Sequence, residues 1–232
     1  MFEPSFMMGD AWTLLKEFPE ESIDLILTDP PYMSMPSRST ADRAVEANKI
    51  IGVFQKEDFL RFAVHCRKVL RPGRHLYCFT QEKVFAENRT AFVEAGFEVR
   101  GTLQWIKKTF TKGDFKADYP IQNEMIIFAK KPDPAGRSRD LFGTIHSNVL
   151  TEFPNLSSNS MIHPTQKPVE LCEYLIKRST EEGEVVFDPF AGVGTTLIAA
   201  MQTERRSIGF ELVEEFYKKG LWRINQLREM IS

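Results

Sequence analysis

The chain has 232 residues, of which 42% are hydrophobic, and a formal net charge of −2. That is enough apolar material to bury the core of one sizeable domain. The sequence lacks the basic and apolar start of a signal peptide, and no apolar run approaches the length of a membrane span. We therefore expect a cytoplasmic protein with no membrane partner. Three cysteines without metal-ligand spacing, Cys66, Cys78 and Cys172, are expected to be buried, reduced thiols, and we expect no metal site.

The first half of the sequence alternates short apolar strands with helical segments. Strands are predicted at Ser5 to Met8, Ile23 to Leu27 and His75 to Phe79, and helices at Ala11 to Phe18, Glu57 to Leu70 and Val84 to Ala95. Pro72-Gly73 is expected to end the second of these helices. The continuous apolar run Ile23 to Leu27 is typical of a parallel strand covered on both faces. Residues 33–53 are polar and weakly periodic, and a loop of this length is usually functional or mobile.

The second half begins with two strands that we expect to pair as a hairpin, Val99 to Ile106 and Met125 to Ala129. Residues 130–165 are rich in Pro, Ser, Asn and Gly and show little periodicity. The remaining predicted elements are helix Val169 to Arg178, strand Val185 to Phe187, helix Thr195 to Gln202, strand Ser207 to Phe210 and helix Val213 to Met230. This alternation predicts an α/β fold with an open, mostly parallel sheet and one antiparallel edge hairpin.

A glycine-containing loop, Asp188-Pro189-Phe190-Ala191-Gly192-Val193-Gly194, joins a predicted strand to a helix. This is the layout of a nucleoside-cofactor site, and Glu211 at the end of the next strand is placed to hold ribose hydroxyls. Asp188 would repel a pyrophosphate, and no lysine follows the glycines as in a triphosphate loop. The pattern favours a cationic or hydroxyl-bearing cofactor such as S-adenosylmethionine. The alternative is a strand-to-helix turn without a ligand.

A second loop, Asp29-Pro30-Pro31-Tyr32, follows the apolar strand in the first half. Its prolines fix the backbone and remove N–H donors, which leaves the Asp29 carboxylate and the Pro30 carbonyl as acceptors. Such a pair can accept both hydrogens of an exocyclic amino group, and Tyr32 offers a flat face for stacking. The alternative is an ordinary Asp-Pro turn. Because ligands bind at the carboxyl ends of parallel strands, both loops are expected to open on one edge of the sheet.

Together these motifs resemble those of the amino DNA methyltransferases, which form N6-methyladenine or N4-methylcytosine. Asp29 to Tyr32 is similar to the catalytic motif of the family, and Asp188 to Gly194 to its S-adenosylmethionine motif. His163-Pro164-Thr165-Gln166-Lys167-Pro168 is similar to a third motif that lines the methionine end of the cofactor site. The order, with the catalytic motif first, resembles the circularly permuted subgroup. The resemblance implies a Rossmann-like methyltransferase domain over residues 1–232, with a small DNA-recognition insertion at about 130–160 and a mobile loop at about 33–53.

The resemblance also implies roles for individual residues. The implied catalytic residues are Asp29, Pro30, Pro31 and Tyr32. The implied cofactor-binding residues are Asp10, Asp29, His163, Thr165, Lys167, Asp188, Phe190, Ala191, Gly192, Gly194, Thr195 and Glu211. The expected DNA contacts are Arg38, Arg43, Trp105, Lys107, Lys108 and Lys112. An excess of basic residues over segment 100–139 is compatible with a polyanion along one face.

The implied substrate is double-stranded DNA whose target base leaves the duplex. A motif that begins with Asp rather than Ser is more typical of adenine enzymes, so adenine N6 is expected and cytosine N4 stays open. Methylation of RNA or of a protein amide is an alternative that the motif order disfavours. An inactive DNA-binding subunit is another, which the intact Asp29, Tyr32, Gly192 and Gly194 disfavour. The sequence leaves open a homodimer and a companion restriction nuclease.

Overall fold

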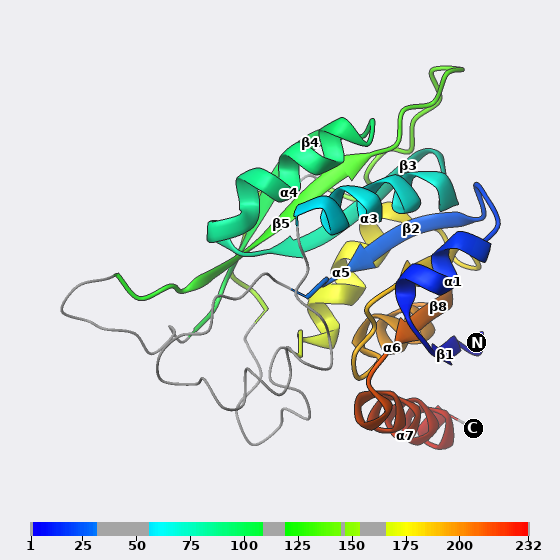
Figure 1. Ribbon diagram of the computed structural model, residues 1–232. Helices are drawn as coiled ribbons and strands as arrows, with labels where there is room; N and C mark the ends of the chain where they lie inside the picture. The colour runs from blue at the N-terminus through cyan, green and yellow to red at the C-terminus, as the bar shows by residue number, and fades with distance from the viewer. Residues whose placement is uncertain (1, 32–55, 109–118, 145–146, 154–165, 232) are drawn as a thin grey trace.

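A mixed sheet runs through the centre of the molecule, with helices on both faces (Figure 1). The computed structural model describes residues 2–31, 56–108, 119–144, 147–153 and 166–231. The strands, in chain order, are β1 (Ser5–Met8), β2 (Ile23–Thr28), β3 (Leu70–Thr80), β4 (Glu98–Ile106), β5 (Asn123–Lys130), β6 (Val149–Leu150), β7 (Val185–Asp188) and β8 (Arg206–Glu211). The helices are α1 (Ala11–Glu17), α3 (Lys56–Val69), α4 (Glu82–Glu94), α5 (Val169–Ser179), α6 (Thr195–Gln202) and α7 (Glu214–Ile231).

The strands lie in the order β1-β8-β7-β2-β3-β5-β4-β6. The first five of these are parallel, and β5 is antiparallel to both β3 and β4. This confirms the predicted open α/β sheet with its antiparallel hairpin. The edge next to that hairpin is β6, which pairs in parallel with β4 and was not predicted, because two residues carry no recognisable period. That the order of the loops reflects a permutation remains an interpretation.

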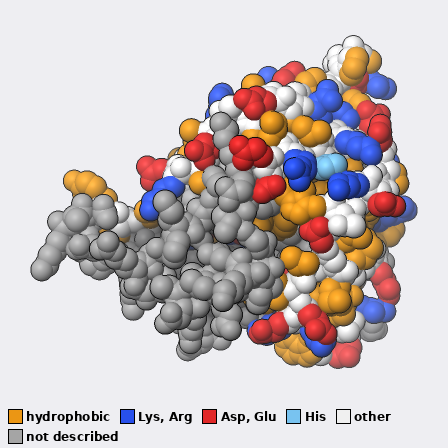
Figure 2. Space-filling view, viewed as in Figure 1, with side chains coloured by type: hydrophobic (Ala, Val, Ile, Leu, Met, Phe, Trp, Pro, Cys, Tyr) orange, Lys and Arg blue, Asp and Glu red, His pale blue; other side chains and the backbone are white. Residues whose placement is uncertain are grey.

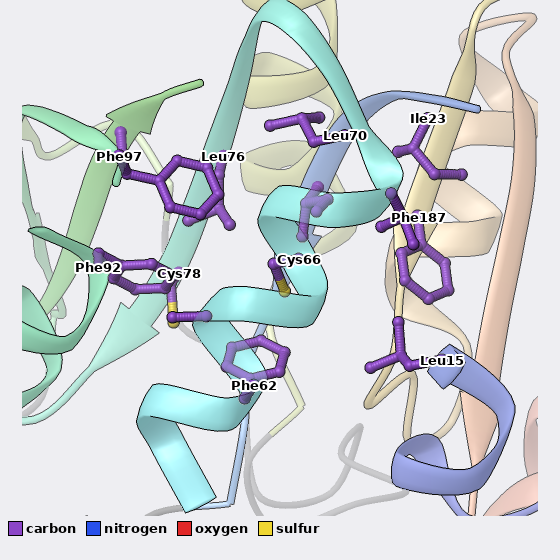
Figure 3. Close-up of a cluster of buried hydrophobic side chains, with 14 of the residues drawn as sticks. Leu15, Ile23, Phe62, Cys66, Leu70, Leu76, Cys78, Phe92, Phe97 and Phe187 are labelled. Carbon is purple, nitrogen blue, oxygen red and sulfur yellow. The ribbon is translucent and has the colours of Figure 1, made fainter. Parts of the chain in front are cut away.

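The apolar side chains of β2 alternate between the two faces of the sheet, and helices cover each face. Leu25 and Leu27 pack in a cluster with α5 and α6, whereas Ile26 packs with α1, α3 and α4. Figure 3 shows the cluster on the face covered by α1, α3 and α4, in which the rings of Phe62 and Phe92 lie 6.4 Å apart. The unbroken apolar run in the sequence predicted this double covering. The three cysteines are free and buried, as expected: Cys66, Cys78 and Cys172. In the described part of the chain, no helix could span a bilayer.

Strand β3 begins earlier than the sequence predicts. Pro72-Gly73 was expected to end the preceding helix, but α3 already ends at Val69 and β3 starts at Leu70. The pairing of β2 with β3 shifts register in this region, which gives the irregularity that a proline needs inside a strand. Gly73 adopts a φ of +76° there, and its N–H donates to the carbonyl of Lys131 at 2.8 Å.

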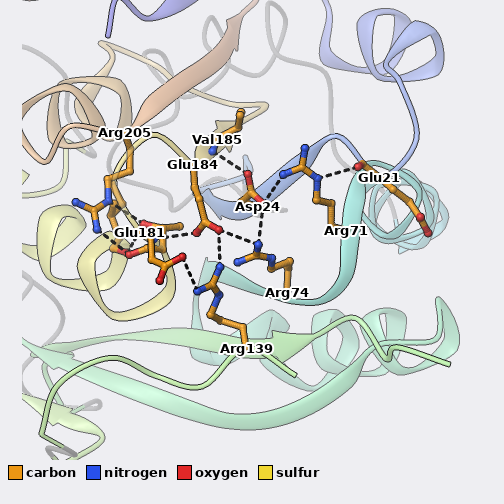
Figure 4. A network of polar contacts seen from close by, with 11 residues as sticks. Glu21, Asp24, Arg71, Arg74, Arg139, Glu181, Glu184, Val185 and Arg205 are labelled. Atoms are coloured by element: carbon orange, nitrogen blue, oxygen red, sulfur yellow. Dashed lines mark hydrogen bonds and ion pairs between the residues drawn. The ribbon is translucent and has the colours of Figure 1, made fainter. Parts of the chain in front are cut away.

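A buried ionic network ties β2, β3 and β7 together at the edge where these strands begin (Figure 4). The Asp24 side chain is only 2% exposed and contacts Arg71 at 2.6 Å and Arg74 at 3.2 Å. Its second carboxylate oxygen accepts a hydrogen bond from the Val185 N–H at 3.0 Å. Arg74 also contacts Glu184, the residue before β7, at 2.7 Å. The network therefore fixes the central strands at the edge away from their carboxyl ends.

Candidate active site

The carboxyl ends of the parallel strands bring the predicted acids to one edge of the sheet. In strand order they are Asp10 after β1, Glu211 at the end of β8, Asp188 at the end of β7 and Asp29 after β2. Strand β5 is antiparallel, so Glu124 near its beginning lies at the same edge. The acids predicted to hold a cofactor and the acid predicted to accept an amine thus follow adjacent strands, although their loops are far apart in the chain.

Asp188 is buried at the end of β7, where donors from its loop and from α6 hold the carboxylate. The Thr196 hydroxyl donates to its Oδ2 at 2.7 Å, and the Phe190 N–H donates to its Oδ1 at 3.1 Å. Burial raises the pKa of Asp188 to about 6, although these hydrogen bonds act in the opposite direction. A buried carboxylate in this loop favours a cationic group and disfavours a phosphate.

The glycines give the loop its sharp turn and its open side. Gly192 has a φ of +54°, and Gly194 has a φ of +75° and caps the N-terminus of α6. Among the described residues, a Cβ at Gly192 would meet no atom within 4 Å, so a ligand can approach there. From α7, Arg223 donates to the Val193 carbonyl at 2.7 Å and to the Thr195 hydroxyl at 3.1 Å. Sequence reasoning missed Arg223 because its position depends on how α7 packs.

Two further residues of the predicted cofactor loop attach it to the core. The ring of Phe190 packs against Phe62 of α3, with the centroids 5.4 Å apart. Ala191 is buried, and its N–H donates to the Phe210 carbonyl of β8 at 2.8 Å. The loop is therefore fixed by β8 and by helices on both faces of the sheet.

Glu211 and Asp10 lie together at the other end of this site. The Gly9 N–H donates to the Glu211 carbonyl at 2.9 Å, which joins the two chain segments. The Glu211 carboxylate is half-buried, which raises its pKa, and it accepts a hydrogen bond from the Val213 N–H at 2.7 Å. The Asp10 carboxylate caps α1, with the Thr13 N–H at 3.2 Å and the Thr13 hydroxyl at 2.9 Å. Asp10 therefore has a structural role besides its predicted contact with the cofactor.

Asp29 leaves β2 half-buried and meets an unexpected partner. The Lys167 ammonium contacts its Oδ2 at 2.5 Å. The following residues of the loop, Pro30 and Pro31, are buried and half-buried. The third motif predicted Lys167 as a cofactor-binding residue, whereas the structure places it against the predicted catalytic acid. Burial alone would lower the pKa of Lys167, but Asp29 and Glu124 raise it above the usual value, so this lysine is a cation.

Glu124 extends this contact into a row of alternating charges. Lys167 lies 3.1 Å from one oxygen of Glu124, and Lys107 lies 2.5 Å from the other. Burial would raise the pKa of Glu124, but the two lysines lower it below the usual value. The Lys167 ammonium also lies 4.9 Å from the centre of the Phe79 ring on β3. Asp29, Lys167, Glu124 and Lys107 thus cross β2, β3, β5 and the end of β4.

The predicted DNA contacts near β4 have different surroundings. Lys108 is exposed, whereas the Lys107 ammonium is engaged by Glu124. Trp105 is only 2% exposed, and its Nε1 donates to the Phe153 carbonyl at 2.6 Å. Its ring therefore offers almost no surface to DNA and supports Lys107, whose ammonium lies 5.3 Å from the ring centre.

Several other basic residues in the described part of segment 100–139 are partnered by acids. Lys130 lies 3.3 Å from Glu98, and Lys131 lies 3.0 Å from Glu21. Figure 2 shows acidic and basic side chains interspersed over the described surface of the face that carries α1, α3 and α4. In the part of the segment that the structure describes, these positive charges therefore lie next to negative ones.

Several predictions fall on residues outside those that the structure describes. They are the site residues Tyr32, Arg38, Arg43, Lys112, His163 and Thr165 and the loop 33–53. The insertion at about 130–160 is described in part, and there the buried Leu150 of β6 packs in the cluster with α5 and α6. These assignments, like the roles of the described site residues, stay predictions.

Comparisons with known proteins agree with this arrangement. The family model described as DNA methylase (N6_N4_Mtase) matches residues 23–221. Type II methyltransferase M.HpaI of Haemophilus parainfluenzae is 29% identical over 94% of this chain and 73% of that protein. Type II methyltransferase M2.DpnII of Streptococcus pneumoniae is 28% identical over 95% of this chain and 89% of that protein.

Two solved structures show the same fold. The M1.HpyAVI–SAM complex has a TM-score of 0.69 and 22% identity, over 95% of this chain and 99% of that chain. The cytosine-N4-specific PvuII DNA methyltransferase has a TM-score of 0.74 and 21% identity, over 98% of this chain and 90% of that chain. Because the family match extends over most of the sequence, the chain belongs to the N6_N4_Mtase family of DNA methylases.

Proposed function

We propose that this protein transfers a methyl group from S-adenosylmethionine to the exocyclic amino group of a base in double-stranded DNA, with adenine N6 as the target. The observation that carries the proposal is the placement of Asp29 directly beside the loop of Asp188, at the carboxyl ends of adjacent strands. An amine acceptor and a loop suited to a cationic cofactor therefore share one edge of the sheet. Membership of the DNA methylase family supports the choice of DNA.

The residues at this edge fit S-adenosylmethionine better than a phosphate-bearing cofactor. The open side of Gly192 lets a ligand approach the backbone, and the half-buried Glu211 is suited to ribose hydroxyls. Asp188 is buried and accepts hydrogen bonds from its own loop and from α6, so it contributes negative charge where a phosphate would be repelled. When bound, S-adenosylmethionine supplies a methyl group attached to a positively charged sulfur.

The proposed work of the protein is to make the target nitrogen nucleophilic. The lone pair of an exocyclic amine is delocalised into the ring, which makes it a poor nucleophile. By accepting hydrogen bonds from the amino group, the Asp29 carboxylate and the Pro30 carbonyl would localise that lone pair. They would also stabilise the positive charge that develops on nitrogen, and Asp29 is placed to take the proton that the nitrogen loses. Positioning and electrostatics supply the catalysis in this mechanism.

The choice of adenine rests on the first residue of the catalytic motif, Asp29. The same acceptors suit cytosine N4, and the solved PvuII enzyme with this fold is cytosine-N4-specific. Relatives named type II methyltransferases support the further proposal of a companion restriction nuclease. Expression in methylation-free cells followed by modification-sensitive sequencing would reveal the base and its sequence context. Unmodified DNA in cells that contain the folded protein would contradict the proposal.

Glu211→Ala is expected to weaken cofactor binding roughly 10- to 100-fold, because a half-buried acceptor for the ribose hydroxyls is lost. Isothermal titration calorimetry with S-adenosylmethionine measures this directly. Glu215→Ala is the control, since Glu215 is exposed on α7 and pairs only with its helix neighbour Lys219 at 2.6 Å among the contacts of the described residues. Equal affinities for both variants would remove Glu211 from the cofactor site.

Cofactor affinity is expected to fall as the pH drops below about 6. The pKa of Asp188 is raised to about 6, so its carboxylate is ionised above this pH and becomes neutral below it. A cationic cofactor prefers the ionised form, which predicts a loss of up to about tenfold in affinity per pH unit below 6. Calorimetry between pH 5 and 8 tests this. Asp188→Asn should bind more weakly at pH 8 and lose the pH dependence; an unchanged dependence would exclude Asp188 as its source.

A further inference from the structure

The Asp29 carboxylate is held by an internal cation in this structure. Lys167 approaches its Oδ2 at 2.5 Å, and the side chain of this lysine is only 7% exposed. The same ammonium lies 3.1 Å from Glu124, which in turn contacts Lys107 at 2.5 Å. The four groups come from four different segments, so the row depends on the tertiary fold rather than on local sequence.

We propose that Lys167 is a positioning residue, whose ammonium fixes the orientation of the Asp29 carboxylate and is itself fixed by Glu124 and Lys107. The inference deepens the proposed function and rests on it, because a fixed orientation of Asp29 matters only if its carboxylate accepts the target amine. A misplacement of about 1 Å at a reacting group can cost about 100-fold in rate. A carboxylate that rotated freely would present its acceptors to the amine only part of the time.

The surroundings of Lys167 leave its ammonium little freedom. It lies 4.9 Å from the centre of the Phe79 ring, on the strand between those that carry Asp29 and Glu124. One carboxylate lies on either side of it, at 2.5 and 3.1 Å. Ionised groups paired in a low-dielectric site attract more strongly than groups in water, so the lysine holds both carboxylates. Its removal would leave two like charges close together.

Other titratable groups lie near Asp29 and interact with its charge. Asp188 on β7, Cys78 on β3 and Cys172 on α5 each experience the charge of Asp29, which raises their pKa values. Burial is the larger cause for all three. Both cysteines have pKa values well above neutrality and carry no charge there, so the charged groups near Asp29 among the described residues include Asp188, Glu124 and Lys167.

The test is a carbon-13 NMR titration of the aspartate carboxyls, with the Asp29 signal identified by its loss in Asp29→Asn. Lys167→Met should raise the titration midpoint of Asp29 by about 1 to 3 pH units, because a cation is replaced by an apolar chain beside a second carboxylate. Adding Glu124→Gln to that variant should lower the midpoint again by about one unit. Such a rescue by a second substitution is not expected from a lysine that only supports the fold.

Lys131→Met is the matched control, since Lys131 is also 7% exposed and pairs with a carboxylate, Glu21, at 3.0 Å. It should leave the Asp29 titration unchanged. An unchanged midpoint in Lys167→Met, an equal rise in Lys131→Met, or no reversal by Glu124→Gln would each overturn the inference. If Lys167→Met does not fold, Lys167→Gln serves in its place, and a midpoint of Asp29 that fails to rise would overturn the inference.

Activity gives a second readout that separates the inference from the proposed function. Lys167→Met should lower kcat roughly 10- to 100-fold with little change in KM for DNA, and Lys167→Arg should restore most of it. The titration needs neither DNA nor cofactor, so it tests the hold on Asp29 even if wild-type protein methylates no DNA. That last result would overturn the proposed function alone.

Discussion

Asp29→Ala is expected to lower kcat for DNA methylation by roughly 1,000-fold or more while the protein stays folded. The substitution removes the carboxylate that would accept the amine hydrogen and stabilise the developing positive charge. The fold should tolerate it because Asp29 is only partly buried and Lys167 keeps Glu124 as a partner at 3.1 Å. Steady-state kinetics with labelled S-adenosylmethionine, together with thermal unfolding, measure both effects.

Asp58→Ala is the control for this experiment. Asp58 lies in the first turn of α3, is also partly exposed, contacts Arg61 at 3.9 Å and is not one of the predicted site residues. It should leave kcat within a few-fold of wild type. The kcat of Asp29→Asn should lie between those of Asp29→Ala and Asp58→Ala, since the asparagine keeps one acceptor oxygen but loses the charge. A near wild-type rate for Asp29→Ala would show that the mechanism is wrong.

Asp24→Ala should lower the free energy of unfolding by about 3 kcal/mol, which corresponds to a Tm lower by about 6–12 °C. The substitution leaves the Val185 N–H without its acceptor and the 19%-exposed Arg74 with one carboxylate fewer. Loss of the contact with Arg71 adds little to the change in the free energy of unfolding, because that side chain is 44% exposed and water can replace the carboxylate. Urea unfolding at neutral pH measures the change.

The comparison variant is Glu215→Ala, which breaks an exposed ion pair with Lys219 within α7. Pairs of this kind contribute about 0.3–0.5 kcal/mol, so its midpoint should barely move. If Asp24→Ala costs no more than Glu215→Ala, the buried network does not stabilise the sheet. Because Asp24 lies near the beginning of β2 and Asp29 follows the other end of the strand, folded Asp24→Ala protein should keep its methylation rate.

The elements with a strong local pattern could be predicted from the sequence. The apolar run of β2 and the alternation of strands and helices indicated a parallel sheet, and the hairpin of β4 and β5 was expected. Two features were missed. Pro72-Gly73 suggested a stop, yet the bulge at the start of β3 accommodates both residues. Strand β6 is two residues long and exists because β4 offers a free edge, which local sequence does not reveal.

In the candidate site, too, some features could be predicted from the sequence and others could not. Asp29, Asp188 and Glu211 could be assigned to one edge because each ends a predicted parallel strand. The partnership of Asp29 with Lys167 joins residues 138 positions apart and depends on the length and direction of a side chain. Arg223, which braces the glycine loop from α7, depends on helix packing in the same manner. Sequence patterns therefore located these acids and Lys167, but not the contact of Lys167 with Asp29 or the contacts of Arg223 with the glycine loop.

The most direct test of the central claim is mass spectrometry of nucleosides from unmethylated DNA incubated with the purified protein and methyl-labelled S-adenosylmethionine. We predict labelled N6-methyladenine with the wild-type protein and none with Asp29→Ala. Labelled N4-methylcytosine would correct the target base and keep the mechanism. DNA without any labelled base, under conditions where calorimetry shows that the cofactor is bound, would contradict the claim that this protein methylates DNA.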